Sequence, residues 1–310
     1  MNVAYIISAY RLPELLVRLV RRLHAPETSI WIHVDARTDD AIFRAMREPL
    51  DGLANVEFLE RHACHWGDFG HVRATLKGLR ALLASARPFD QAVLLTGQDY
   101  PLQSNAGIAA RLAAEPGRVF MHWLPIPNEH WTDGGTYRIR DWHFRFAGRA
   151  RSFPGAPFRS ARLNAAWSRA ARLAGAQRSF PPGLEPYGGS SYWMMPAACV
   201  RYVDEFVRTH PDYVRFFEHV RIPDEIFFHT IVMNSPFRDR VSADDLRYID
   251  WSEAGDSPRV LTLADYGKLV DSGKLFARKF DPAVDGTVLD RLDEAAGVAP
   301  AGPAPDQKIV

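Results

Sequence analysis

The first hundred residues alternate between strand-like and helix-like segments, and this alternation constrains the fold more than any other feature of the sequence. Four short apolar runs predict buried strands, at residues 3–8, 29–35, 56–59 and 92–95. Helices are predicted to begin near Pro13 and Phe69, because leucine and valine recur there at helical spacing. This order predicts a mixed, mostly parallel sheet flanked by helices, in a single α/β domain. Ligands of such a sheet bind beyond the carboxyl ends of its strands, where Asp35 and Asp99 stand.

The predicted domain covers residues 1–285. Further strand-like and helical segments are predicted later in the chain, at residues 187–195, 246–251, 264–269 and 275–280. Residues 295–310 are rich in alanine, proline and glycine, so they are predicted to form a disordered tail.

Residues 137–180 differ in amino-acid composition from the rest of the domain. Arginine recurs throughout this insertion, with tryptophan and phenylalanine interleaved. The plain interpretation is a basic surface helix or loop. The functional alternatives are a docking surface for an anionic polymer or a membrane, or the wall of an acceptor cleft.

Composition narrows the class of protein. The 310 residues are 47% hydrophobic and 12% aromatic, which is enough for one large core. The formal net charge is only +1, whereas a nucleic-acid-binding protein normally carries a strong basic excess. Cys64 and Cys199 are too few for a disulfide framework, so two reduced thiols in a cytosolic protein are expected. No apolar run reaches the length of a membrane span, and we expect a cytoplasmic protein, at most peripheral to the inner membrane.

The segment 222–230 contains a candidate general base. Pro223 suits the first position of a helix, and Asp224 and Glu225 then fall in the first turn, where the helix dipole favours negative charge. A carboxylate held in this way stays ionised near neutral pH on a rigid support, which suits a general base. The plain alternative is an acidic helix start without a catalytic role.

Motifs for metal ions and phosphate loops are lacking. The sequence has no H-x-x-x-H pair, no cysteine cluster and no D-x-D triplet, the usual means of holding a divalent cation on a nucleotide-sugar diphosphate. It also lacks G-x-x-x-x-G-K-[ST] and G-x-G-x-x-G. We therefore expect neither a metal nor a cofactor, and a diphosphate would need cationic side chains instead. Arg247, Arg278 and Lys279 are candidates, although they could equally be surface charges.

Other catalytic patterns are weak. A serine hydrolase would want G-x-S-x-G, which is absent. Asp224 and Glu225 could be paired hydrolytic carboxylates, but neighbours in a helix point about 100° apart and flank a glycosidic bond badly. His33 and His65 are more readily interpreted as core histidines. Trp193 is more readily a core residue than a platform for a sugar.

Six short blocks, taken in order, resemble one family. They are A-Y-I-I from Ala4, I-H-V-D ending at Asp35, T-G-Q-D-Y-P from Thr96, G-S-S-Y-W ending at Trp193, P-D-E ending at Glu225 and L-F-A-R-K-F from Leu275. Together they resemble glycosyltransferase family 14, which contains the core-2/I-branching β-1,6-N-acetylglucosaminyltransferases and the peptide O-xylosyltransferases. The likeness runs from Val3 to about Asp285.

The resemblance implies a GT-A-like (Rossmann-like) fold and an inverting, metal-independent transfer from a UDP-sugar. The family's catalytic carboxylate falls on Glu225, as the base for the attacking acceptor hydroxyl. Its diphosphate-neutralising residues fall on Arg247 and Lys279, with Arg278 as a further candidate.

The resemblance also implies positions near the donor, and two further residues are candidates for contact with the acceptor. His33, Asp35 and Asp99 resemble positions near the nucleotide and the donor sugar. Tyr192 and Trp193 are candidates for contact with the acceptor, which is a glycan, a glycolipid or a protein.

The chain departs from the animal members of this family, which are disulfide-rich Golgi proteins with a membrane anchor. It resembles a bacterial cytosolic relative instead. The blocks around Glu225 and Arg278 resemble the xylosyltransferase branch more than the other, so the donor stays open between UDP-GlcNAc and UDP-xylose. The alternative function is a catalytically idle module that binds a carbohydrate or a nucleotide.

Overall fold

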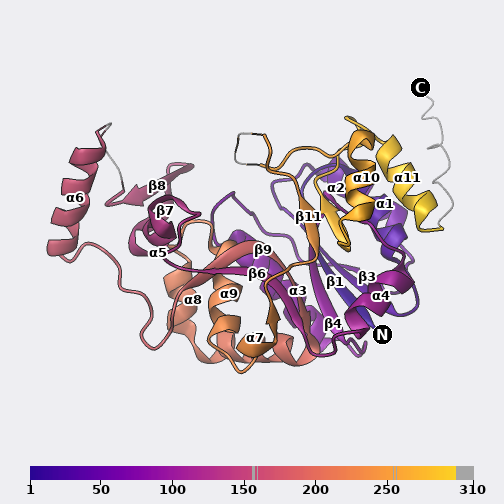
Figure 1. Cartoon of the computed structure of the whole chain (residues 1–310), viewed down its shortest axis with the longest axis horizontal. Helices are drawn as coiled ribbons and strands as arrows, with labels where there is room; N and C mark the ends of the chain where they lie inside the picture. Colours follow the sequence, from indigo (N-terminus) through magenta and orange to yellow (C-terminus); the bar gives the residue numbers. More distant parts are fainter. Residues whose placement is uncertain (156–157, 159, 254, 256, 298–310) are drawn as a thin grey trace.

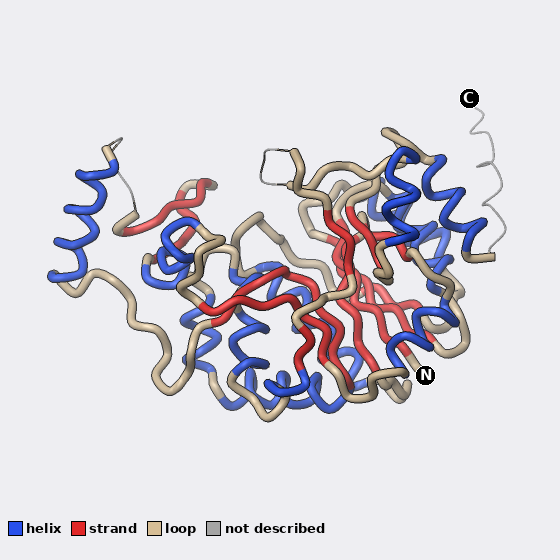
Figure 2. Tube along the Cα trace, in the orientation of Figure 1, coloured by secondary structure: helices blue, strands red, loops and turns tan. Residues whose placement is uncertain are grey.

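A computed structural model describes residues 1–155, 158, 160–253, 255 and 257–297 of the chain. At its centre lies a seven-stranded sheet with helices on both faces (Figure 1 and Figure 2). In spatial order, the strands are β10 (Val241–Ser242), β6 (Val119–Pro125), β9 (Tyr187–Pro196), β4 (Gln91–Thr96), β1 (Val3–Ala9), β2 (Thr28–Val34) and β3 (Val56–Phe58). Only β9 runs antiparallel to its neighbours, β4 and β6. The predicted α/β domain with a mostly parallel, GT-A-like sheet is confirmed.

Helices cover the two faces of this sheet and bury two apolar cores. One face carries α1 (Pro13–Leu23), α2 (Asp40–Arg47), α4 (Asn105–Ala113), α10 (Tyr266–Asp271) and α11 (Thr287–Ala295). The other carries α3 (Gly70–Ala84), α7 (Ala197–Thr209), α8 (Pro211–Phe217) and α9 (Phe227–Met233). Along β1, Tyr5 and Ile7 point into the first core, while Ala4 and Ile6 point into the second. Burial on both faces explains why this strand is a continuous apolar run in the sequence.

A small second sheet joins the end of the chain to the central one. It has the order β11 (Arg247–Ile249), β12 (Phe276–Arg278) and β5 (Asp99–Pro101). Because β12 pairs antiparallel with β5, Arg278 lies directly opposite Asp99. The late strand segments predicted at 246–251 and 275–280 are therefore real but shorter, and they bring basic residues to the end of β4.

The insertion at residues 137–180 projects from the body, at the left of Figure 1. It contains α5 (Thr136–Arg140), a hairpin of β7 (Trp142–Phe146) and β8 (Arg149–Phe153), and α6 (Ala161–Leu173). We call residues 142–184 the basic arm. The sequence predicted a surface helix or loop here, and the hairpin was missed. Its two-residue turn, Ala147 and Gly148, has both residues in the left-handed region, and alanine there is a weak turn signal.

The folded unit extends past the predicted boundary at residue 285. Three apolar residues of α11 are buried in the first core. Its Asp293 accepts hydrogen bonds from Arg18, Arg22 and Tyr100. The predicted tail, residues 295–310, falls almost entirely outside the described residues. None of the described helices has the length and hydropathy needed to cross a membrane.

Candidate active site

A pocket of about 550 Å³ opens at the carboxyl ends of β1, β2 and β4, where the sheet topology predicts a ligand. The loops after these strands form one side. The rest comes from β9, from the 3-10 turn Pro223–Glu225 and from the end of β12. The predicted site residues that line it are His33, Asp35, Tyr192, Glu225, Arg278 and Lys279.

Glu225 stands on a short turn rather than inside a helix. Pro223–Glu225 is one 3-10 turn, and α9 begins only at Phe227 because the backbone of Ile226 is not helical. The predicted positions of Pro223, Asp224 and Glu225 at the start of a helical turn are confirmed, but this 3-10 turn ends at Glu225 and does not continue into α9. Arg138 holds the carboxylate instead, with its Nη1 2.5 Å from Glu225 Oε2. The Glu225 side chain is 30% exposed, and it faces the pocket.

Burial raises the pKa of Glu225 above that of an ordinary glutamate. The neighbouring Asp224 raises it further, while Arg138 opposes both effects. The expectation that a helix dipole keeps this group ionised is therefore replaced by an ion pair with Arg138. A raised pKa makes the carboxylate a better proton acceptor near neutral pH, which strengthens its case as a general base.

Asp224 is held beside Glu225 by β9. Ser191 Oγ donates to Asp224 Oδ2 at 2.9 Å. The other carboxylate oxygen, Oδ1, is buried and has no hydrogen-bond partner among the described residues. Asp224 also lines the pocket, so two carboxylates stand side by side in this part of its wall.

Three cationic side chains line another part of the pocket wall. Arg11 follows β1, and Arg278 and Lys279 stand at the end of β12. Burial and the charges of Arg278 and Arg11 lower the pKa of Lys279. Lys279 forms no ion pair with any described residue, and its Nζ donates to Ser257 Oγ at 2.5 Å. Arg11 pairs with Asp281 at 2.8 Å, so the positive charge that suits an anionic group such as a diphosphate comes from Arg278 and Lys279.

Arg247 and Asp99 lie beneath the pocket rather than in its wall. Both side chains are fully buried, and Arg247 Nε lies 3.1 Å from Asp99 Oδ1. Arg278 Nε lies 3.8 Å from the same oxygen. Arg247 and Asp99, which were predicted to lie at the donor, are therefore absent from the lining of the pocket. Their ion pair leaves no free charge at its surface, and Asp99 also lies within ion-pair distance of Arg278.

The predicted acceptor contacts also change. Trp193 is fully buried and packs against Phe228, with ring centroids 5.6 Å apart, so it cannot stack on an acceptor. Tyr192 lines the pocket, but the guanidinium carbons of Arg247 and Arg278 lie 4.0 and 4.7 Å from its ring centroid. Its ring therefore supports the cations. The exposed aromatic rings that line the pocket are those of Trp66, Trp251 and Tyr10, which are 56%, 57% and 54% accessible.

Two glycines of β9, Gly188 and Gly189, make room for neighbouring parts of the protein. A Cβ at Gly188 would lie 2.5 Å from Trp131, and one at Gly189 would lie 2.0 Å from the carbonyl oxygen of His122. Gly188 thus makes room for Trp131, over whose ring the guanidinium of Arg138 lies at 3.9 Å. The strand, Trp131 and Arg138 together support Glu225.

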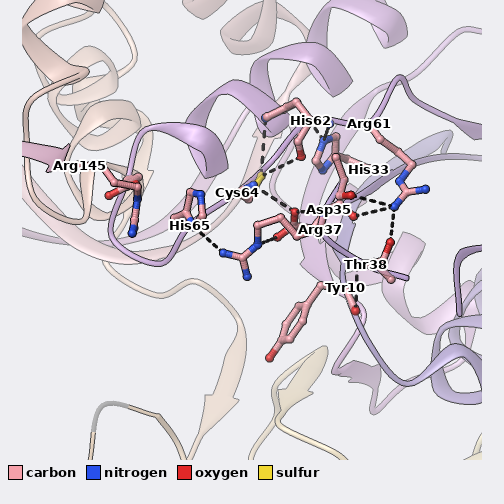
Figure 3. A network of polar contacts seen from close by, with 12 residues as sticks. Tyr10, His33, Asp35, Arg37, Thr38, Arg61, His62, Cys64, His65 and Arg145 are labelled. Carbon is pink, nitrogen blue, oxygen red and sulfur yellow. Dashed lines mark hydrogen bonds and ion pairs between the residues drawn. The ribbon is translucent and has the colours of Figure 1, made fainter. Parts of the chain in front are cut away.

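His33 and Asp35 meet a polar network beside β2 (Figure 3). Asp35 Oδ1 accepts from the backbone N–H groups of Arg37 and Cys64, at 2.9 and 3.2 Å. His33 Nε2 lies 3.0 Å from His62 Nδ1. Burial lowers the pKa of His33 to about 4, so its ring is neutral at physiological pH.

This network also contains a group that the sequence reasoning missed. Within the described part of the chain, His33, His62 and Cys64 are a group whose ligand atoms converge closely enough to hold a metal ion. The Cys64 thiol lies 3.6 Å from His62 Nε2. The sequence predicted no metal site, because His33 stands 29 residues before His62 and only the fold brings them together.

Two other pocket residues were missed, for different reasons. Arg11 follows the carboxyl end of β1, so the strand-end rule that selected Asp35 could have found it. Arg138 stands 87 residues before Glu225, in a segment full of arginines, and no local pattern distinguishes it from the others.

Comparisons with known proteins show the family of the chain. The family model described as Core-2/I-Branching enzyme matches residues 3–269. Xylosyltransferase oxt of Drosophila melanogaster is 25% identical over 303 residues, which cover 89% of this chain and 31% of that protein. Human Xylosyltransferase 2 is 26% identical over 315 residues, which cover 94% of this chain and 33% of that protein. The chain thus spans about a third of the length of these relatives. Because the family model matches most of its residues, the chain belongs to the Core-2/I-branching enzyme family of glycosyltransferases.

Proposed function

We propose that this protein transfers a sugar from UDP-GlcNAc or UDP-xylose to a hydroxyl group of a glycan, a glycolipid or a protein. Membership of the family supports sugar transfer, and the names of the relatives favour xylose as the donor sugar. The observation that carries the proposal is one pocket that holds both a half-buried carboxylate, Glu225, and a group of cations, Arg278 and Lys279.

In the proposed reaction, Glu225 takes the proton of the acceptor hydroxyl as its oxygen attacks C1 of the donor sugar. The bond between C1 and the diphosphate oxygen breaks on the opposite face, so the configuration at C1 inverts. The electron pair of this bond leaves with UDP. The raised pKa of Glu225 supports its role as the proton acceptor.

We assign charge neutralisation of the departing UDP to Lys279 and Arg278. Arg247 acts indirectly, through the oxygen of Asp99 that it shares with Arg278. These cations would do the work that a divalent metal does elsewhere, and we propose that transfer needs no metal. His33 and Asp35, on the side of the pocket formed by β2, are proposed neighbours of the nucleotide.

The proposed setting is the cytoplasm, close to the inner membrane. A large exposed basic segment supports contact with a membrane, and the net charge of +1 gives no support to a nucleic acid as partner.

The test of this proposal is a calorimetric and thermal-shift titration with UDP, UDP-GlcNAc and UDP-xylose, each with EDTA and with Mn²⁺. We expect UDP to bind equally well in both, and the donor with the higher affinity to support transfer. Binding that requires Mn²⁺ would overturn the metal-free mechanism. Binding without transfer to any hydroxyl acceptor, including water, would instead favour an idle binding module.

Lys279→Ala should weaken UDP binding in the same titration, because it removes an unpaired cation from the pocket. Lys268→Ala is the matched control, since Lys268 is an exposed residue of α10 outside the pocket. Equal UDP affinity in both variants would remove Lys279 from the proposed site.

A further inference from the structure

The basic arm has positively charged side chains and no negatively charged ones. Its eight arginines are Arg145, Arg149, Arg151, Arg159, Arg162, Arg169, Arg172 and Arg178, and residues 142–184 contain no lysine, aspartate or glutamate. Arg145 pairs with Asp68 at 2.9 Å, and the guanidinium of Arg178 stacks on Trp142 and Phe216. The other arginines that the structure describes in this arm form no ion pair with described residues. Their charge is free to meet a partner.

The hairpin of the arm presents aromatic rings to solvent on one face. Trp142, Phe144 and Phe146 alternate along β7, and all three are exposed, Phe146 to 68%. Their cross-strand partners on β8 are Phe153, Arg151 and Arg149, respectively. Directly paired residues share a face of a two-stranded ribbon. One face of the hairpin therefore carries four exposed aromatic side chains and two arginines.

Helix α6 exposes its large apolar residues and turns polar residues toward the protein, whereas an ordinary surface helix does the reverse. Asn164, Ser168 and Ala171 recur at helical spacing on its less exposed side. That side borders a cavity of about 690 Å³ lined largely by polar and charged side chains. Leu163 and Leu173 point to solvent instead and are 55% and 83% exposed.

Arginines flank the outward apolar stripe of α6. Leu163, Ala166, Ala170 and Leu173 follow one another at spacings of three and four residues, so they share one stripe, and all four are exposed. At about 100° per residue, Arg162 and Arg169 lie along the edge of this stripe. A soluble helix normally buries its apolar stripe, whereas a helix that lies at a membrane surface turns it outward beside basic residues.

We propose that the basic arm docks onto the surface of an anionic phospholipid bilayer. Aromatic rings favour the level of the lipid headgroups, and the exposed leucines of α6 would enter the boundary with the acyl chains. The free arginines would meet the negative surface charge while their stems cover apolar surface. Docking does not depend on which sugar is transferred, or on transfer at all.

Two other partners fit this surface less well. A soluble anionic polymer would neutralise the arginines but would leave Leu163 and Leu173 in water. A second copy of the chain would cover the apolar groups only by bringing two arms of like charge together, and neither arm has an acidic residue to relieve the repulsion.

Vesicle sedimentation with the full chain tests the proposal without any sugar donor. Vesicles of phosphatidylcholine are compared with vesicles that also contain phosphatidylglycerol, at low and at high salt. We expect binding to the anionic vesicles only, and weaker binding at high salt. Equal binding to both kinds of vesicle, or to neither, would overturn the proposal, and this comparison needs no variant.

Matched charge variants locate the surface. Each basic residue near an anionic bilayer contributes about fivefold in affinity. Arg149→Gln, Arg151→Gln and Arg162→Gln together should therefore weaken binding about 100-fold, because these three arginines lie beside the exposed aromatic rings of the hairpin and the outward stripe of α6. The control removes three exposed arginines of the body, Arg80, Arg208 and Arg215, in the same way, and it should change binding less than about threefold. An equal loss of vesicle binding in the two triple variants would show that net charge alone attracts the protein, and it would reject the arm as the docking surface.

An apolar variant separates a bilayer from the other partners. Leu163→Gln with Leu173→Gln should weaken vesicle binding at least tenfold while leaving binding to heparin, a soluble polyanion, unchanged. If vesicle binding is unaffected, the arm recognises charge only and the bilayer is the wrong partner. If the variant instead abolishes a dimer seen by light scattering in the unmodified protein, the outward stripe is an interface between copies.

Discussion

At the scale of single residues, Glu225 gives the sharpest prediction. Glu225→Gln keeps the shape of the side chain but removes its ability to take a proton, so turnover should fall about 10²–10⁴-fold. UDP affinity should stay unchanged, because Arg278 and Lys279 are untouched. Turnover is measured as UDP release with acceptor present, and affinity by calorimetry.

The control for this variant is Glu218→Gln. Glu218 is an exposed residue whose ion pair with Arg73 has an N–O distance of 3.5 Å, and it lies outside the pocket. Both turnover and UDP affinity should be normal in this control. Normal turnover in Glu225→Gln itself would mean that another group takes the proton.

Arg138 should set the pH dependence of the reaction. It lowers the pKa of Glu225 against burial and Asp224, so Arg138→Gln should raise that pKa further. Because the base acts in its ionised form, activity is lost as pH falls through this pKa. The acid limb of the profile of kcat/KM should therefore move to higher pH in Arg138→Gln, and it should move less in Arg138→Lys, which keeps a cation. If the acid limb does not move in Arg138→Gln, Arg138 does not set the pKa of Glu225.

At the scale of elements, α11 should matter to stability through one carboxylate. Asp293 is buried, and it accepts hydrogen bonds from Arg18, Arg22 and Tyr100. Asp293→Ala would leave the charge of Arg22 buried without its partner, which costs about 3–5 kcal/mol of unfolding free energy. Urea denaturation measures this loss.

Asp290 is the matched control on the same helix. It also pairs with Arg18, at 2.7 Å, but its side chain is 47% exposed. Asp290→Ala should therefore cost less than about 1 kcal/mol. Equal losses in the two variants would mean that burial of the network around Asp293 does not determine its strength.

The same scale shows which elements a sequence can predict. β1, β2 and β4 were found because strands buried on both faces are continuous apolar runs. α4 was missed because it buries only Ile108 and Leu112, too few to make a periodic pattern. α11 was missed for a related reason, since it is short and adjoins a stretch rich in alanine and glycine.

Some residues of the site could also be predicted from the sequence, and others could not. Short motifs identified Glu225, Arg278 and Lys279, because each stands in a local block of residues that resembles a known family. Arg138 and the pairing of Arg247 with Asp99 depend on contacts across 87 and more residues, which no local pattern contains. The interpretation of Trp193 as a core residue is confirmed, whereas its assignment as an acceptor contact is wrong, because the sequence of β9 alone does not show which of its residues face the core.

At the scale of the whole molecule, two cores and an arm should differ in stability. β1 lies between the two cores, and the residues at its centre are fully buried, whereas α6 buries only Ala171. Amides of β1 should therefore exchange with solvent only through global unfolding, and those of α6 through local opening. Hydrogen exchange followed by mass spectrometry measures both in one experiment. Exchange in α6 as slow as in β1 would mean that the arm is packed against something in solution.

Two ligands should slow exchange in two different places. UDP should protect the loops around the pocket, including the turn at Pro223–Glu225, because it binds only the folded pocket. Anionic vesicles should protect α6 and the β7–β8 hairpin and leave the pocket loops unchanged. Protection of both regions by either ligand alone would mean that the arm and the pocket are coupled, and the membrane would then regulate transfer as well as recruit the enzyme.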